Sequence, residues 1–193
     1  MPNKKSHLQY IENKALEILD KYKLGKKAPV DIFKVAKKIG LEVYGDTLNE
    51  DISGILFIEK GQGKIGINSS HPPVRKRFTI AHEIGHFVLQ HNRKNQFFID
   101  ESNKHMSMKF HRDSNSSTGE MRQEREANAF AAAILMPEKL LQKEVENFNF
   151  DLSNPYGNTT EGDDLDRLAE KFVVSSQAMA FRLANLNFFD PLF

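Results

Sequence analysis

The feature that most constrains this chain is the stretch FTIAHEIGHFVLQH, which runs from Phe78 to His91. Its apolar residues recur at the spacing of an amphipathic helix; they are Ile80, Ile84, Phe87 and Val88. On such a helix His82 and His86 lie one turn apart on one face, where two imidazoles can bind one zinc ion. Glu83 is turned about 100° from His82 and can act on a water molecule without ligating the metal.

A core helix that merely carries histidines is the alternative interpretation. The His-Glu-x-x-His pattern arises by accident in roughly one in a hundred chains of this length, and packing could bury His82 without a metal. The chain has no cysteine, so any metal site must use His, Asp or Glu.

Catalytic zinc commonly takes three protein ligands. The downstream candidates for the third are His91, Asp100, Glu101, His105, His111, Glu120, Glu124 and Glu126. Glu124 begins the segment EREANAFAAAILMP and heads a stripe of small and apolar residues, so we expect its carboxylate to point inward, where it needs a cation. Asn128, one turn later, is placed to hold the second ring nitrogen of a ligand histidine. Glu126 stays an alternative ligand, or an exposed charge paired with Arg122 or Arg125.

The rest of the chain has regular helix and strand patterns. We expect helices near 6–23, 31–39, 73–91 and 120–136, with two short ones at 165–172 and 176–186. We expect strands at 41–44, 53–59 and 64–68, the last two forming a hairpin, and a weak strand at 106–111. The segments 53–59 and 106–111 are candidate sheet edges for an extended substrate. The segment 154–162 is the best linker, which predicts domains at 1–150 and 151–193.

The last two helices resemble a helix-turn-helix unit. The second of them carries only Arg182 as a basic residue, and a DNA-reading helix normally makes several phosphate and base contacts. We therefore expect a small helical subdomain or protein-docking surface and no direct DNA binding.

Overall charge agrees with this expectation. The formal net charge is +1, which favours neither nucleic acid nor a membrane surface as partner. The N-terminus has no apolar leader region and the chain has no long apolar run, so we expect neither secretion nor membrane insertion. Together with the absence of cysteine, this predicts a cytoplasmic protein.

HEIGH followed by E-x-x-A-N-x-F-A-A-x-I-L-M-P resembles the ImmA/IrrE family of metallopeptidases. The resemblance extends upstream, over roughly Pro29 to Pro137; the further matching segments are Pro29-Val30-Asp31-Ile32, Gly40-Leu41-Glu42-Val43, Ser53-Gly54, Ile67-Asn68 and Arg77-Phe78-Thr79. It implies an α+β fold with a zincin-like core, in which a small, mostly antiparallel sheet packs on helices, followed by the helical tail.

The resemblance also implies roles for residues. His82, His86 and Glu124 would bind zinc, or manganese, and Glu83 would be the catalytic acid/base. The spacing from Glu124 to Asn128 is similar to the E-x-x-x-D arrangement of gluzincins and favours Glu124 over Glu126. His111 and Arg112 precede the ligand helix and are candidates for transition-state or substrate contact, with an ordinary surface loop as the alternative.

Family members of this kind typically cleave a partner repressor, which implies an XRE-type helix-turn-helix protein of a mobile element, toxin–antitoxin or stress-response system as substrate. We expect no sensor domain beyond the tail. The alternative is a non-catalytic regulator that binds a repressor or DNA through its tail. An intact Glu83 favours the peptidase, because binding alone does not need it.

Overall fold

The computed structural model describes residues 4–59, 62–91, 97–101, 119–147, 158–159 and 162–188. The helices in these ranges are α1 (Lys4–Lys21), α2 (Ile32–Lys38), α3 (Pro73–Val88), α5 (Gly119–Leu135), α6 (Glu138–Asn147), α7 (Asp164–Phe172) and α8 (Ser176–Asn185). The strands are β1 (Leu41–Asp46), β2 (Ile52–Glu59), β3 (Gln62–Asn68), β4 (Phe97–Glu101), β5 (Asn158–Thr159) and β6 (Gly162–Asp163).

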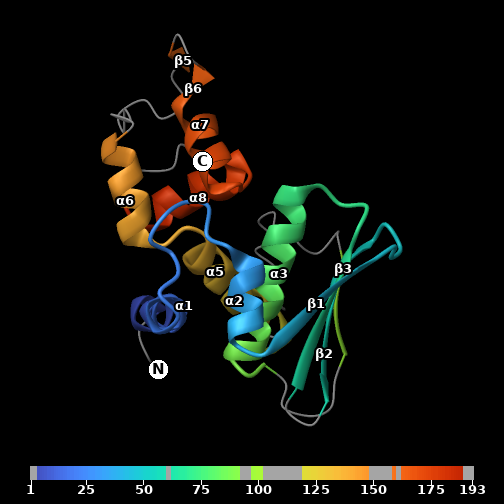
Figure 1. Ribbon diagram of the computed structural model, residues 1–193. Helices are drawn as coiled ribbons and strands as arrows, with labels where there is room; N and C mark the ends of the chain where they lie inside the picture. The colour runs from blue at the N-terminus through green and yellow to red at the C-terminus, as the bar shows by residue number, and fades with distance from the viewer. Residues whose placement is uncertain are drawn as a thin grey trace.

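Four strands form the main sheet in the order β1-β3-β2-β4. The β1–β3 pairing is parallel, and the β2–β3 and β2–β4 pairings are antiparallel. Leu56 and Ile65 face each other across β2 and β3, and both are fully buried. This mostly antiparallel sheet, with helices packed on one of its faces, confirms the predicted α+β class (Figure 1).

Two details of the sheet differ from the sequence prediction. β4 was not expected; it pairs with β2, for example Ile99 with Ile55. The prediction that 53–59 is a sheet edge is therefore wrong, because β3 and β4 flank β2 on both sides. The second predicted edge, 106–111, lies outside the described residues.

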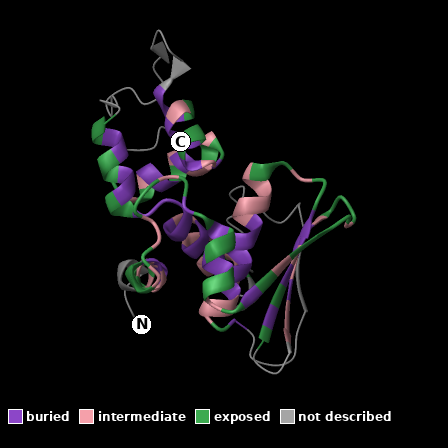
Figure 2. Ribbon diagram, in the orientation of Figure 1, coloured by how far each residue is buried: buried purple, intermediate pink, exposed green. Residues whose placement is uncertain are grey.

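The helix that carries HEIGH lies between the sheet and α5 (Figure 1). On the sheet side, the close packing of α3 depends on Gly54 of β2. A Cβ at that position would come within 2.3 Å of Cγ2 of Thr79, so a larger residue would push α3 away from the strand. Both α3 and α5 are largely buried along their shared side (Figure 2).

Local signals explain where the smaller elements begin and end. Asp31 accepts a hydrogen bond from the backbone of Lys34 at 3.0 Å and caps α2, and Gly40 has a φ of 85° just after that helix. Ser175 accepts from the backbone of Ala178 at 3.2 Å and caps α8. The expected linker at 154–162 contains β5 and the first residue of β6, which pair in an antiparallel ladder.

The helical tail packs on the rest of the molecule. Phe172 and Leu183 are fully buried and belong to the same hydrophobic core as α3 and α5. Arg182 forms a two-point ion pair with Glu12 of α1, at 2.6 and 2.8 Å, and donates to the carbonyl oxygen of Met136 at 3.0 Å. The boundary at 150/151 stays a prediction.

Candidate metal centre

His82 and His86 lie on the buried face of α3, with 1% and 2% of their side chains exposed. Their ring centroids are 4.6 Å apart, and their Nε2 atoms approach to 2.9 Å. The two Nε2 atoms therefore face one common point, as the i, i+4 spacing predicts.

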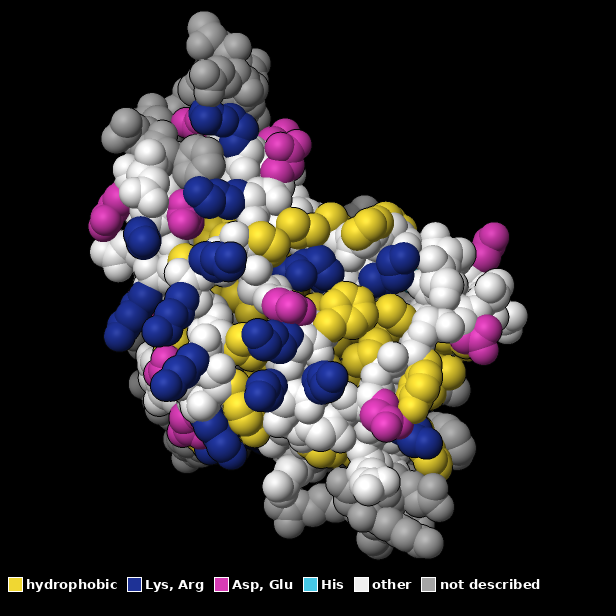
Figure 3. All heavy atoms as spheres, viewed as in Figure 1, with side chains coloured by type: hydrophobic (Ala, Val, Ile, Leu, Met, Phe, Trp, Pro, Cys, Tyr) yellow, Lys and Arg dark blue, Asp and Glu magenta, His cyan; other side chains and the backbone are white. Residues whose placement is uncertain are grey.

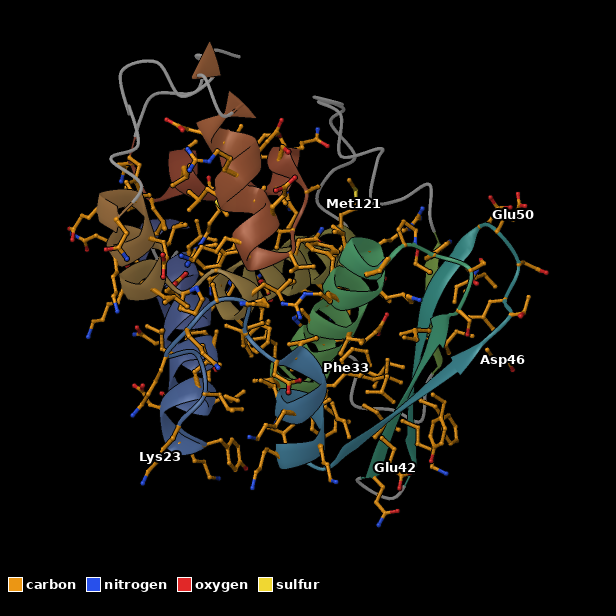
Figure 4. All side chains as sticks on the ribbon, turned by 45° about the horizontal axis from the view of Figure 1, so that its top comes forward. Lys23, Phe33, Glu42, Asp46, Glu50 and Met121 are labelled. Carbon is orange, nitrogen blue, oxygen red and sulfur yellow. The ribbon has the colours of Figure 1, made fainter. Side chains whose placement is uncertain are left out.

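Glu124 reaches the same point from α5. Its Oε2 lies 3.2 Å from Nε2 of His82, and its Oε1 lies 3.4 Å from Nε2 of His86. Burial alone would raise the pKa of this carboxyl, but the two histidines outweigh it and hold the pKa of Glu124 well below its usual range. Glu124 is 40% exposed, and Met121, one turn earlier, is exposed as well (Figure 4). Among the described residues, the metal group is therefore most exposed on the side of Glu124, near the start of α5.

These three residues fit a divalent metal ion. Zinc ligands at about 2.0–2.2 Å in tetrahedral geometry are roughly 3.3 Å from one another, and the three separations here are close to that value. Within the described ranges, His82, His86 and Glu124 are the one group of this kind whose ligand atoms converge. Two imidazole nitrogens and a carboxylate oxygen suit zinc and also allow manganese.

Close contact between α3 and α5 brings the ligands together. A Cβ on Gly85 would lie 3.1 Å from Cα and from the carbonyl oxygen of Ala127, and 3.2 Å from Cβ of Phe130. A larger residue would force α5 away by a few tenths of an ångström, so the glycine favours this close approach, and the small residues of α5 complete it.

Glu83 lies beside the three ligands but on a different side of α3. It is buried, with 1% exposed, and a Cβ at Gly54 would lie 3.4 Å from its Oε1. Its carboxylate therefore faces β2, while the ligand atoms face α5. This is the placement that a general base needs if it is not to ligate the metal; the role itself stays a prediction.

Asn128 lies behind His82. Its Oδ1 is 2.9 Å from Nδ1 of His82, so a proton on Nδ1 can be donated to the amide oxygen while Nε2 keeps its lone pair for a metal. The sequence argument expected this contact from the one-turn spacing between Glu124 and Asn128.

Glu126 and His91 do not join the ligand group. Glu126 pairs with Arg122 at 2.6 Å, which the sequence allowed, and also with His91 at 3.1 Å and His7 at 2.7 Å. Burial would raise the pKa of Glu126, but these partners lower it below its usual range. Burial lowers the pKa of His91 below its ordinary value, although Glu126 acts in the opposite direction. Nothing in the sequence pointed to His7, because it is remote in the chain from Glu126.

The side chains of the remaining candidate residues lie outside the described part of the structure. His105, His111 and Arg112 lie outside the described residues. Asp100 and Glu101 are in β4 and Glu120 is in α5, but only their backbone is described. The roles predicted for His111 and Arg112 stay predictions.

The family model described as the IrrE N-terminal-like domain, Peptidase M78, matches residues 36–184. The match includes all three residues of the metal group and most of the helical tail. The chain belongs to this family. The resemblance seen in the sequence is thereby confirmed, and membership supports metal-dependent protease activity in general terms.

A solved structure described as a Mycobacterium tuberculosis transcriptional regulator is similar to this IrrE-like chain. The TM-score is 0.56 at 17% sequence identity, over 95% of this chain and 47% of that one. At this identity the likeness concerns the fold alone, and the chain spans about half the length of that protein. No curated protein shows significant sequence similarity to the chain.

None of the described helices combines the length and the apolar content that a membrane span requires. The hydrophobic side chains visible in Figure 3 are interspersed with Lys, Arg, Asp and Glu.

Proposed function

We propose that this protein is a zinc-dependent endopeptidase that cleaves a specific protein partner. The observation that carries the proposal is the convergence of His82, His86 and Glu124, from two helices, beside a buried Glu83. A protein that only binds a partner has no need for such a combination.

Each of these residues would have a distinct role in the reaction. His82, His86 and Glu124 would hold the metal, which when bound supplies polarisation of the peptide carbonyl and a lowered pKa for water. Glu83 would take the proton of the attacking water and pass it to the leaving amine. The exposed side of Glu124 would be where the peptide enters. Manganese is the alternative to zinc.

We infer that the partner is an XRE-type helix-turn-helix repressor, and that cleavage takes place in the cytoplasm. Family resemblance supports this partner, and a structural neighbour that bears the name of a transcriptional regulator is consistent with it. Lack of cysteine supports the compartment.

The tail is a poor candidate for reading DNA. Arg182, the basic residue of α8, is 5% exposed and engaged with Glu12 and Met136, so its guanidinium is not available to a phosphate. This favours a protein substrate over a DNA site. A non-catalytic regulator that binds a repressor remains the competing hypothesis.

Co-expression with candidate helix-turn-helix repressors tests the proposal. We expect one repressor to be cut, with cleavage lost in Glu83→Gln and in His82→Ala but kept in Glu138→Gln, a matched change at an exposed glutamate of α6. Zinc content should fall in His82→Ala and persist in Glu83→Gln. Cleavage that survives Glu83→Gln would refute the assigned chemistry, and binding of a repressor without cleavage would favour the regulator.

A further inference from the structure

A line of polar side chains runs from His86 to the N-terminal helix. Nδ1 of His86 lies 3.0 Å from Nδ1 of His91, and Nε2 of His91 lies 3.1 Å from Oε2 of Glu126. The other carboxylate oxygen of Glu126 lies 2.7 Å from Nε2 of His7 in α1. Residues from the end of α3, from α5 and from α1 thus share one chain of contacts.

The end of α3 explains why His91 meets His86 at all. On a continued helix, a residue five positions further would point to another side. Instead the helix stops, and Gln90 adopts a left-handed φ of 56°. The backbone N–H of Gln90 donates to Phe87 at 3.3 Å and that of His91 donates to His86 at 3.1 Å, which is a Schellman motif. This turn folds the His91 ring back under His86.

The contacts have one consistent direction of hydrogen bonding. If Nε2 of His86 binds a metal, the proton of that ring must be on Nδ1, which then donates to Nδ1 of His91. The proton of His91 is then on Nε2 and is donated to the carboxylate of Glu126. His7 donates to the other oxygen. Every contact in the line from His86 to Glu126 thus joins one donor to one acceptor.

Burial distinguishes this arrangement from a surface ion pair. The side chains of His91 and Glu126 are 5% and 14% exposed. Arg122, which also contacts Glu126, is 63% exposed, and contacts of that kind contribute little. Within the described residues, His7, His91 and Glu126 do not form a second group with metal-binding geometry.

We propose that His91 and Glu126 are positioning residues that fix the ring of His86 for metal binding, and that His7 makes the docking of α1 part of this positioning. The inference rests on the metal centre of the proposed function, but not on peptidase activity. Partners that hold a ligand histidine by its other nitrogen typically contribute about 10- to 100-fold in metal affinity.

Zinc affinity of the purified protein, measured by competition with a chelator, tests the proposal. We expect Glu126→Ala and His91→Ala to bind zinc about 10- to 100-fold more weakly than the wild type. Glu126→Gln should recover most of the loss, because its amide oxygen can still accept from His91. His7→Ala should lose less than about tenfold, and the control Arg122→Ala should stay within about twofold.

The absorption spectrum of the cobalt-substituted protein gives a second readout. At saturating cobalt, a reoriented His86 should change the visible bands of folded Glu126→Ala, whereas a purely structural role for Glu126 would leave them unchanged. Wild-type affinity and spectrum in Glu126→Ala and His91→Ala would overturn the proposal. An equal loss in Arg122→Ala would also overturn it, because the effect would then be one of surface charge.

If Glu126→Ala fails to fold, wild-type affinity in His7→Ala still overturns the part played by α1, and a loss there supports it. If zinc affinity depends on this chain of contacts as proposed, but the wild-type protein cleaves no repressor, the proposed function alone is refuted. Cleavage by a Glu126→Ala variant of undiminished affinity would refute the positioning role alone.

Discussion

His82 and His86 are one helical turn apart, yet the Nδ1 atoms of the two rings have different hydrogen-bond partners. Nδ1 of His82 faces Asn128, on the same helix as Glu124. Nδ1 of His86 faces His91, which is held by Glu126 and through it by His7 of α1.

The two ligands therefore depend on different parts of the fold. The support of His82 needs only the contact between α3 and α5, which Gly85 allows. The support of His86 also needs the turn after α3 and the docking of α1. We therefore expect changes in α1 to affect His86 first, and changes between α3 and α5 to affect both ligands.

The largest effect on stability is expected at the other attachment of α1, the buried pair of Arg182 and Glu12. Arg182→Met leaves the carboxylate of Glu12 nearly buried without its cation, which costs on the order of 3 kcal/mol of unfolding free energy. Chemical denaturation of Arg182→Met and of the wild type measures this loss of unfolding free energy. The exposed pair of Glu17 with Lys14 is the control, and Glu17→Gln should leave the stability nearly unchanged. If the metal affinity of folded Arg182→Met is also reduced, the docking of α1 affects the metal centre through more than the contact of His7 with Glu126.

The next effect is expected where both ligands depend on one contact. Gly85→Val places a side chain against the backbone of Ala127 and should destabilise the fold by about 1–3 kcal/mol. Zinc affinity should fall as well, because Glu124 moves away from both histidines. In β3 a Cβ on Gly66 has its nearest neighbour at 3.9 Å, so Gly66→Val should retain both properties. Full zinc affinity in Gly85→Val would contradict the role given to this contact.

A smaller and more selective effect is expected for the support of His82. Asn128→Ala removes the acceptor for Nδ1 and should weaken zinc binding by about tenfold, with little change in the stability of the metal-free protein. Because Asn128 and Glu126 act on different ligands, the losses in free energy of the double variant Asn128→Ala/Glu126→Ala should be nearly additive. Strong non-additivity in chelator competition would show that the two supports are one network.

The smallest effect is expected at an ion pair that touches neither histidine. The hydrogen bond from Lys171, at 2.6 Å, outweighs burial and lowers the pKa of Glu144 below its ordinary value near 4.5. The pair therefore stabilises the fold above that pH, and the contribution is lost as the pH falls through the lowered value. Lys171 is more than a third exposed, so screening keeps the contribution below about 1 kcal/mol. Denaturation of Lys171→Met at neutral and acidic pH should show a difference from wild type at neutral pH alone, with zinc affinity unchanged at neutral pH.

Sequence alone determined the face of each ligand helix. The spacing of His82 and His86, and the inward stripe headed by Glu124, follow from the 3.6-residue period, which needs no knowledge of the partners. The same period placed Asn128 one turn from Glu124. The hairpin of β2 and β3 and the caps of α2 and α8 were likewise local signals.

Only the tertiary structure decided which polar groups become neighbours across the fold. Glu126 could be read as a ligand or as an exposed charge paired with an arginine. It does pair with Arg122, but it lies outside the ligand group and is mostly buried, because α1 and the turn after α3 bring His7 and His91 to its two oxygens. Arg182 could be read as a DNA contact, and packing of α8 buries it against Glu12 instead. The physical reason is the same in both cases. A helical period fixes the direction of a side chain, but the partner that a buried charge requires comes from whichever element packs against it.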